Sequence, residues 1–376
     1  MDFSFIIWNG SPELLTFGQV TLRWYGLLFA LGFLISQQLL SYMYKKEGKP
    51  LSEVDNLTIV MVVATILGAR LGHVIFYQPE LFIENPLGVL LPFEFSPSFR
   101  FTGLQGLASH GGAIAILLGL YLYARRKKQS YLVILDRIVI LVAITGACIR
   151  LGNYFNSEII GKPTEQPWGV VFTSRLTQAV ESTIEVNNPV ESALIVRDTV
   201  AREDNAFLSR EGAVPLVMYV FFKPETSEED LRFFVNSRIK DYVNRLYEFF
   251  YDDPTRPLDY TFLKQENSYV AKIKLTGVAR HPAQLYESVS CLILFAALFW
   301  YWNKHRNALP AGRIFGIFLV VLWGLRFAYE FLKENQEAFE ADLPLNMGQI
   351  LSIPLFIAGV GVLLWSFRKT PSAKTE

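Results

Sequence analysis

The chain has 376 residues, of which 51% are hydrophobic, and its 35 basic and 35 acidic residues give a formal net charge of zero. The mean hydropathy of +0.27 indicates that lipid is the solvent for much of the chain. Zero net charge excludes the broad basic field that nucleic-acid binding usually needs. The two cysteines lie in separate apolar runs and the four histidines are scattered, so neither a disulfide framework nor a sequence-local metal site is expected.

Apolar segments long enough to cross a bilayer as helices, which takes about 18–25 residues, recur along the chain. They lie at 21–43, 56–78, 108–124, 131–151, 282–302, 311–332 and 346–367. The first is not expected to be a cleaved signal peptide, because Asp2 and Glu13 precede it without a basic segment and its apolar run is too long. The pattern predicts an α-helical integral membrane protein with seven transmembrane helices.

Basic clusters set the expected orientation of these helices. They follow the first, third, fifth and seventh spans, at 45–49, 125–128, 304–306 and 368–374. Cytoplasmic loops are enriched in Lys and Arg, so this side is predicted to be cytoplasmic. The amino terminus then lies in the periplasm and the carboxyl terminus in the cytoplasm.

Four segments follow from this topology. The first four transmembrane helices, with a periplasmic loop at 79–107, occupy 1–161; a soluble periplasmic insertion occupies 162–279; the last three helices occupy 280–368; a cytoplasmic tail occupies 369–376. Within the insertion, residue patterns predict strands at 214–222, 259–263 and 269–275 and a charged amphipathic helix at 228–250. The insertion is therefore expected to be a small α+β unit of βαββ type.

Ionisable residues at membrane depth are costly, and each needs a partner or a function. For Asp136, Arg137 and Arg313 on the inner side, snorkelling to the headgroups is sufficient explanation. The outer side carries a larger set, drawn from six of the seven helices: Arg23, Arg70, His73, His110, Arg150, Glu158, Arg280, His281, Glu287, Arg326 and Glu330. Arginines outnumber carboxylates in it, which favours a site for an anionic ligand such as a lipid phosphate.

Structural explanations stay open for several members of the outer set. Arg23 beside Trp24 is equally consistent with an interfacial anchor. Arg70 shares a helix face with glycines that allow close helix packing. Arg326 and Glu330 are four residues apart and could neutralise one another in lipid.

Three segments are more specific than composition. Ser109-His110-Gly111-Gly112 opens the third span, where the glycines let a backbone or a lipid approach the imidazole closely. Residues 150–161 read R-x-G-N-x-x-N-x-E-x-x-G as the chain leaves the membrane, which is more polar capacity than a helix exit requires. Residues 280–287 and 347–352 form two polar entries into apolar helices.

These segments together resemble the prolipoprotein diacylglyceryl transferase family of bacterial inner-membrane enzymes. The likeness runs over all seven spans, from Arg23-Trp24-Tyr25-Gly26 through 68–73 to Met347-Gly348-Gln349, and 150–161 matches the family signature. It implies a phosphatidylglycerol donor and a lipobox cysteine in a prolipoprotein signal peptide as acceptor. The outer position of the ionisable set predicts a site at the periplasmic leaflet, and the implied reaction requires no metal or organic cofactor. Matching positions imply catalytic roles for His110, Arg150, Arg326 and Glu330, and substrate-binding roles for Tyr25, Arg70, Arg150, Asn153, Glu158 and Gly161.

Two positions depart from the family pattern. Leu322, with Trp323 beside it, stands where a tyrosine is common one turn before the arginine of the sixth span. The stretch 331–335, Phe-Leu-Lys-Glu-Asn, lacks the usual Arg-x-Pro-Asp ending. A tyrosine role at the first position is therefore not expected in this chain.

The implied reaction moves a glyceryl carbon from phosphate oxygen to thiol sulfur, giving a thioether and glycerol 1-phosphate. A free thiol has a pKa of about 8.5 and needs a base, for which His110 is the candidate. Arg150 and Arg326, with Arg70 as a further candidate, would stabilise charge on the leaving phosphate. Glu330 would hold Arg326, and Glu158 with Asn153 would order the mouth of the site.

Two other functional classes remain open on the residues alone. Buried arginines also mark anion transporters and channels, although the charges gather at one leaflet and no internal repeat is visible. A structural membrane subunit that binds a partner through the periplasmic insertion is the other alternative.

Overall fold

The computed structural model describes residues 5–17, 20–89, 93–94, 100–101, 106, 108–182, 188–199, 206–224, 226–265, 268–334 and 343–368. It divides into two compact units. One, here called the sheet unit, comprises Met1–Ala30, Ala147–Ser290 and Leu325–Leu351; the other, the helical unit, comprises Leu31–Gly146, Cys291–Gly324 and Ser352–Glu376. The boundaries between these segments fall inside helices, so most long helices contribute residues to both units.

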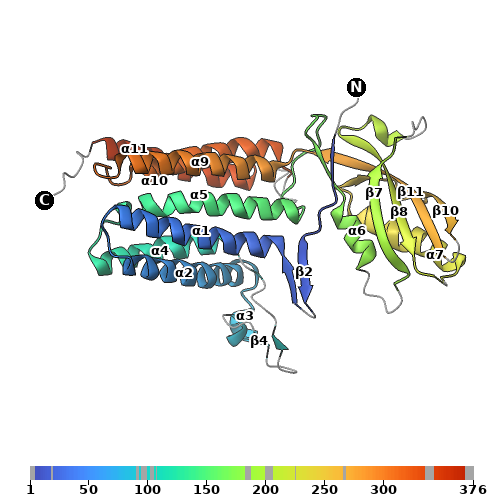
Figure 1. Cartoon of the computed structure of the whole chain (residues 1–376), viewed down its shortest axis with the longest axis horizontal. Coiled ribbons are helices and arrows are strands. Elements are labelled where there is room, and N and C mark those ends of the chain that lie inside the picture. Colours follow the sequence, from blue (N-terminus) through green and yellow to red (C-terminus); the bar gives the residue numbers. More distant parts are fainter. Residues whose placement is uncertain are drawn as a thin grey trace. The chain divides into compact units, whose positions relative to one another are not determined.

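Each predicted span coincides with a helix (Figure 1). The helices are α1 (Trp24–Lys46), α2 (Ser52–Tyr77), α4 (Ser109–Lys127), α5 (Tyr131–Phe155), α9 (Ala283–His305), α10 (Arg313–Tyr329) and α11 (Met347–Phe367). Within the described residues, 6 helices are long and apolar enough to cross a membrane, and α4 is not one of them. Its polar first turn and three basic residues in the last turn lower its hydropathy. The chain is thus a multi-pass membrane protein, while a seventh crossing and the orientation stay predictions.

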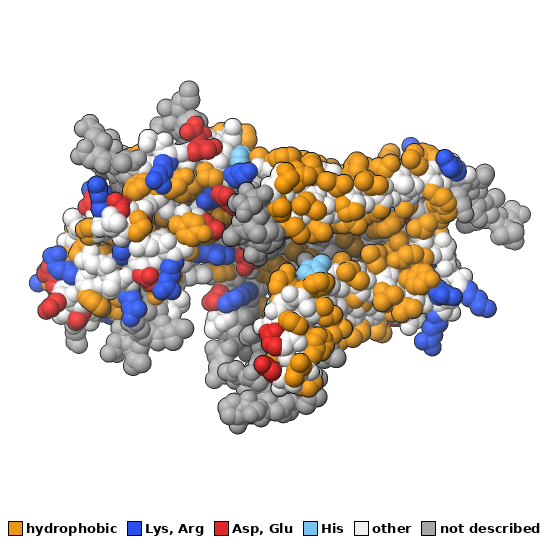
Figure 2. All heavy atoms as spheres, turned by 180° about the vertical axis from the view of Figure 1, so that it is seen from behind, with side chains coloured by type: hydrophobic (Ala, Val, Ile, Leu, Met, Phe, Trp, Pro, Cys, Tyr) orange, Lys and Arg blue, Asp and Glu red, His pale blue; other side chains and the backbone are white. Residues whose placement is uncertain are grey.

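Apolar side chains from six helices form the core of the helical unit. Leu40 of α1, Leu57 of α2, Leu120 of α4, Ile140 of α5 and Trp302 of α9 are all fully buried there. Hydrophobic side chains also cover much of the outer face of the helices, and Lys and Arg gather at one end (Figure 2). An apolar outer surface over long helices is what contact with lipid tails requires.

The helices α2 and α4 pack closely because small residues line their contact. The backbone N–H of Ala108 donates to the carbonyl of Ala69 at 2.9 Å, and the backbone of Gly111 lies against Gly68 and Gly72. The packing explanation for this glycine-rich face is therefore supported by the contacts. A short helix, α3 (Leu81–Glu84), and a 3-10 turn at Leu87–Val89 follow α2.

Snorkelling is the wrong interpretation for Asp136. Its side chain is 0% exposed, and its two oxygens accept the backbone N–H groups of Gly312 and Phe315 at 2.7 and 2.8 Å. Gly312 immediately precedes α10 and Phe315 lies in its first turn, where N–H groups have no partner within the helix. Asp136 is therefore a buried cap of a neighbouring helix, because that helix starts beside it in the folded chain.

Arg137 does not snorkel either, since it is buried and ion-paired. Its guanidinium donates to Glu47 at 2.9 and 3.1 Å, and the same carboxylate oxygen accepts from Trp302 Nε1 at 2.7 Å. Burial alone would raise the pKa of Glu47, but the charge of Arg137 and hydrogen bonds from Lys49 and Trp302 outweigh it and hold that pKa below its ordinary value of 4.5. Arg313 instead donates to Ser366 at the end of α11.

The main sheet belongs to the sheet unit and combines strands from distant parts of the chain. Its order is β1 (Ile6–Trp8), β6 (Val170–Phe172), β11 (Ser268–Arg280), β8 (Ala213–Phe222) and β7 (Val190–Arg197), while β9 (Phe250–Tyr251) and β10 (Asp259–Gln265) also pair with β11. Only the β1–β6 pair is parallel among these. Two further hairpins join β2 (Glu13–Phe17) to β3 (Val20–Arg23) and β4 (Phe93–Glu94) to β5 (Arg100–Phe101).

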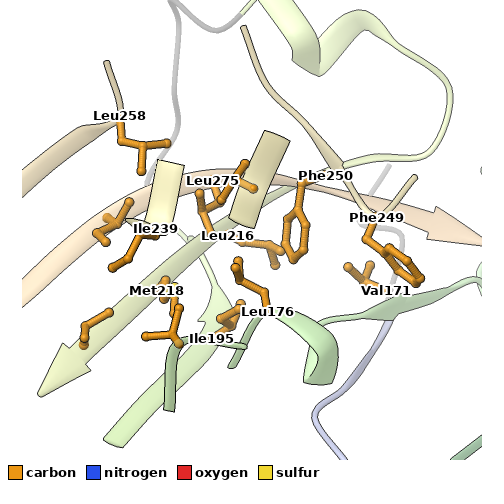
Figure 3. Close-up of a cluster of buried hydrophobic side chains, with 14 of the residues drawn as sticks. Val171, Leu176, Ile195, Leu216, Met218, Ile239, Phe249, Phe250, Leu258 and Leu275 are labelled. Carbon is orange, nitrogen blue, oxygen red and sulfur yellow. The ribbon is translucent and has the colours of Figure 1, made fainter. Parts of the chain in front are cut away.

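The elements predicted at 214–222, 259–263 and 269–275 are the strands β8, β10 and β11. The predicted helix at 228–250 is shorter: α7 (Glu228–Phe234), a π-helical turn (Val235–Ile239) and α8 (Lys240–Arg245). Together with α6 (Ser174–Glu181), these helices pack apolar side chains on the sheet, and Leu176, Leu216 and Ile239 are fully buried in that cluster (Figure 3). Strands β1, β6 and β7 were not predicted.

Candidate active site

A row of alternating charges crosses the described part of the sheet unit from α5 to α10. Arg150 Nε of α5 lies 2.5 Å from Glu287 Oε2 of α9, and the other oxygen of Glu287 pairs with the ammonium of Lys333. Lys333 Nζ donates to Glu330 Oε1 at 2.9 Å, and Arg326 Nε lies 3.8 Å from the same oxygen. Arg150, Glu287, Lys333, Glu330 and Arg326 are called the charge row below.

The charge row contains one more cation than carboxylates. Among the described residues, Arg150, Lys333 and Arg326 pair with two carboxylates of the row, Glu287 and Glu330, so the five members of the row carry three positive and two negative charges, a formal charge of +1. Lys333 is 1% exposed and Glu330 5%, whereas the Arg326 side chain is 34% exposed. Charge interactions in a buried row are weakly screened, so a net positive charge here favours an anion at its accessible end.

Asn346, just before α11, also holds the carboxylate of Glu330. Asn346 Nδ2 donates to Glu330 Oε2 at 3.3 Å, and Asn346 Oδ1 accepts the backbone N–H of Gln349 at 2.9 Å. Gln349 Oε1 in turn accepts the backbone N–H of Asn346 at 3.2 Å, which completes a reciprocal cap at the start of α11. A Cβ at Gly348 would lie 2.5 Å from Glu330 Cδ, so only glycine admits the carboxyl group at this point.

The signature segment forms its own polar cluster where α5 ends. Asn153 Nδ2 and Asn156 Nδ2 each lie 3.4 Å from a different carboxylate oxygen of Glu158, and Gln284 Nε2 of α9 donates to the Glu158 carbonyl at 2.5 Å. Glu158 is thus held in place by two amides and a neighbouring helix. The expected role of Asn153 and Glu158 in ordering the mouth of the site stays a prediction.

Gly161 lies where three chain segments cross. Its N–H donates to the His281 carbonyl at 3.1 Å, its carbonyl accepts from Arg280 NH1 at 3.0 Å, and it forms an isolated antiparallel bridge with Lys333. A Cβ at this position would lie 2.4 Å from the His281 carbonyl oxygen and 2.9 Å from that of Leu332. Glycine is therefore required by the close approach of two backbones, and it places Lys333 beside the end of the signature.

His281 links the end of the sheet to α9. Its Nδ1 lies 3.1 Å from the hydroxyl of Tyr286, and that hydroxyl accepts from Trp168 Nε1 at 2.8 Å. Burial lowers the pKa of His281 below its ordinary value of 6.5, against a weaker opposing effect of Glu211. Burial of His281 therefore favours the neutral form of its imidazole.

Tyr25 lies in the sheet unit, at the start of α1. Its ring packs on the signature helix, because a Cβ at Gly152 would meet Tyr25 Cδ2 at 2.9 Å. This contact is two residues along the chain from Arg150. The expected role of Tyr25 in substrate binding stays a prediction.

His110 and Arg70 lie in the helical unit. His110 is exposed at the start of α4, with its ring 5.1 Å from that of Phe76. Arg70 Nε and NH2 donate to the carbonyls of Val89 and Gly88 at 2.9 and 2.7 Å. The guanidinium of Arg70 therefore organises the turn after α3, a structural role that the sequence did not indicate.

Sequence reasoning missed two members of the charge row. The sequence places Glu287 among the outer ionisable residues without indicating a role. Lys333 falls in the stretch 331–335, which departs from the family pattern. A lysine just after a span usually reads as an interfacial anchor, which hides its burial. The useful signal was the spacing of Lys333 three residues after Glu330, which puts both on one side of a helical turn.

The sequence predicts neither a metal site nor a tyrosine role at position 322. Among the residues that the structure describes, no three His, Cys, Asp or Glu side chains are grouped to hold a metal ion. Leu322 and Trp323 pack against the apolar core of the helical unit. Both side chains are therefore packing residues in this chain.

Comparisons with known proteins relate nearly the whole chain to one family. A family model described as prolipoprotein diacylglyceryl transferase matches residues 12–365. Relatives named phosphatidylglycerol–prolipoprotein diacylglyceryl transferase include one from Tolumonas auensis, 28% identical over 365 residues that cover 97% of this chain and 98% of the relative. Others are from Bacteroides fragilis, 29% identical over 97% and 96%, and Chloroherpeton thalassium, 29% identical over 99% and 98%. The chain therefore belongs to the prolipoprotein diacylglyceryl transferase family.

Proposed function

We propose that this chain transfers the diacylglyceryl group of phosphatidylglycerol to the lipobox cysteine of prolipoproteins, the first step of lipoprotein maturation. The family match over residues 12–365 and the names of the relatives support the reaction. The observation that carries it to this site is the charge row, whose excess of one positive charge suits a phosphodiester with a single negative charge.

Arg150 and Arg326 are the proposed phosphate ligands. They stand at the two ends of the charge row, and each is oriented by a buried carboxylate, Glu287 or Glu330. A guanidinium held in one rotamer loses less entropy when it binds an oxyanion, and it stabilises charge that grows on the leaving phosphate. Tyr25, Asn153, Glu158 and Gly161 shape the adjoining surface, and Arg70 is a further candidate ligand.

The chemical step needs a thiolate and a leaving group. His110 takes the thiol proton, the sulfur attacks the glyceryl carbon bonded to phosphate, and a C–S bond replaces the C–O bond. The electron pair of that C–O bond leaves on the phosphate oxygen, so glycerol 1-phosphate departs. No cofactor takes part in this scheme. The assignment of His110 rests on the sequence resemblance and on its exposed position at the start of α4.

The proposed location is the bacterial inner membrane, with seven crossings, a periplasmic amino terminus and the active site at the periplasmic leaflet. The basic last turns of α1 and α4 and the basic residues after α9 and α11 support this orientation, because all four helix ends would then face the cytoplasm. The insertion at 162–279 would then be periplasmic.

Mass spectrometry of an acceptor peptide tests the function directly. The purified chain in detergent, given phosphatidylglycerol and a peptide with a lipobox cysteine, should add the mass of one diacylglyceryl group to the peptide. Arg150→Ala and Arg326→Ala should each lower the rate about 10²-fold or more, the usual effect of removing a donor that stabilises an oxyanion. Arg232→Ala, at an exposed arginine of the same unit paired with Glu228, should leave the rate unchanged.

Two outcomes would contradict the assignments. Near-normal rates in Arg150→Ala or Arg326→Ala would remove that residue from charge stabilisation, and an unchanged pH–rate profile in His110→Asn would remove the imidazole as base. An unmodified peptide in the presence of the wild-type chain, together with uptake of anions into proteoliposomes, would favour the transporter alternative instead.

A further inference from the structure

Lys333 occupies the centre of the charge row, although its sequence context suggests an interfacial residue. It follows the 3-10 turn Glu330–Leu332 at the end of α10, and its side chain is 1% exposed. Its ammonium contacts Glu287 of α9 and Glu330 of the adjacent turn. An ammonium without partners would be very costly at this depth, so the two carboxylates are what make its burial tolerable.

The backbone around Lys333 is fixed by its neighbours. Lys333 forms the isolated bridge with Gly161, and the N–H of Lys162 donates to the carbonyl of Leu332 at 2.8 Å. The ammonium is thus held between the segment that leaves α5 and the first turn of α9. Such a rigid attachment allows the side chain to orient other groups.

We propose that Lys333 is a positioning residue, which bridges Glu287 and Glu330 and thereby holds Arg150 and Arg326 in the geometry that binds the lipid phosphate. This inference rests on the proposed function. Each carboxylate has one oxygen on Lys333, and Glu287 has its other oxygen on Arg150. Removal of the ammonium would leave Glu287 and Glu330 without their shared cation. Arg150 and Arg326 would then have to move toward these carboxylates to neutralise them.

The formal charge of the row also predicts a loss of activity when Lys333 is removed. Without Lys333, Arg150 and Arg326 face two carboxylates, and the formal charge of the row falls from +1 to zero. A neutral row attracts a phosphodiester less strongly, so the KM for phosphatidylglycerol should rise. The kcat should fall as well, because Arg150 and Arg326 stabilise the leaving phosphate only when their guanidinium groups are correctly placed.

The test compares two buried lysines of the same unit. Lys333→Met should lower kcat/KM for phosphatidylglycerol about 30-fold or more, with both KM raised and kcat reduced. Lys240→Met is the matched control, since Lys240 is also buried and pairs with Asp252. It should destabilise the fold in thermal unfolding but leave KM unchanged. Lys333→Arg keeps the charge and should recover most of the lost activity.

A double-mutant cycle separates positioning from general destabilisation. Lys333→Met and Arg326→Lys should be coupled, with a combined loss about tenfold smaller than the product of the single losses, because both disturb one linked row. Lys240→Met and Arg326→Lys should multiply independently. Should Lys333→Met not fold, the same cycle with Lys333→Gln, which also removes the charge but keeps a polar side chain, decides the matter, since coupling supports positioning and independence refutes it.

Failure of the Lys333 role and failure of the proposed function give different results. An unmodified peptide with the wild-type chain would refute the proposed function. An active wild-type chain whose Lys333→Met variant keeps the normal KM and kcat, or combines independently with Arg326→Lys, would refute the positioning role alone.

Discussion

Replacement of Gly161 by alanine adds one methyl group where the signature segment crosses two other backbones. The new Cβ would lie 2.4 Å from the His281 carbonyl oxygen, 2.6 Å from His281 Cβ and 2.9 Å from the Leu332 carbonyl oxygen. Two of these three atoms belong to the backbone, so rotation of a side chain cannot relieve the clash. The segment has to move away from α9 and from the end of α10.

Steric overlap and two broken hydrogen bonds set the energetic cost of this movement. Overpacking of a tight site costs about 1–3 kcal/mol. Loss of the bond from Gly161 N–H to His281 adds about 1 kcal/mol, and loss of the charged donor Arg280 adds about 1.5–3 kcal/mol. We therefore expect Gly161→Ala to lower the free energy of unfolding by about 3.5–7 kcal/mol, less whatever local relaxation recovers.

Thermal unfolding in detergent and transfer to the acceptor peptide should both report the change. Transfer should fall further than stability alone explains, because the bridge from Gly161 also places Lys333. Gly361→Ala in α11 is the control, since a Cβ there would meet no atom within 4 Å and alanine favours the helix by about 1 kcal/mol. A Gly161→Ala chain with normal stability and normal transfer would refute the crossing geometry.

Three further predictions concern the helical unit. Asp136→Asn should cost about 1–3 kcal/mol, because its amide turns a donor toward the N–H groups that open α10; an unchanged melting temperature would contradict the cap. Glu47→Gln should cost about 3 kcal/mol by leaving Arg137 buried without its counter-charge. Folding lowers the pKa of Glu47, so its contribution to the free energy of unfolding is present above about pH 4.5 and is lost as the pH falls through the lower folded value. The Glu47→Gln variant lacks this contribution at every pH. Its melting temperature should therefore decline less in acid than that of the wild type. Arg70→Met should speed proteolytic cleavage near residues 85–89, and equal cleavage would remove its role in that turn.

Much of the candidate site could be predicted from local spacing. Arg326 and Glu330 are four residues apart on an apolar helix, and the signature carries Arg150, Asn153 and Glu158 within nine residues. Arg326 and Glu330 meet as expected, because residues four apart share one side of a helix. Asn153 also contacts Glu158, but Glu158 lies beyond the end of α5, so the turn after the helix and not helical spacing brings this pair together.

Contacts between distant segments could not be predicted in the same way. Glu287 meets Arg150 across 137 positions of sequence, and Asp136 meets the start of α10 across 176. No periodic pattern encodes such pairs, and β1, with three residues, is too short to show the alternation typical of a strand. The snorkelling interpretation failed for the same reason, since it considered each charged residue only with its own helix.

The parallel pairing of β1 with β6 constrains the order of assembly during synthesis. Ile6–Trp8 leave the ribosome before α1, yet their partners at Val170–Phe172 emerge only after α5. The first strand therefore has no partner for its ladder until α1, α2, α4 and α5 have been synthesised. A contact between such distant segments forms slowly, because a long loop must close first.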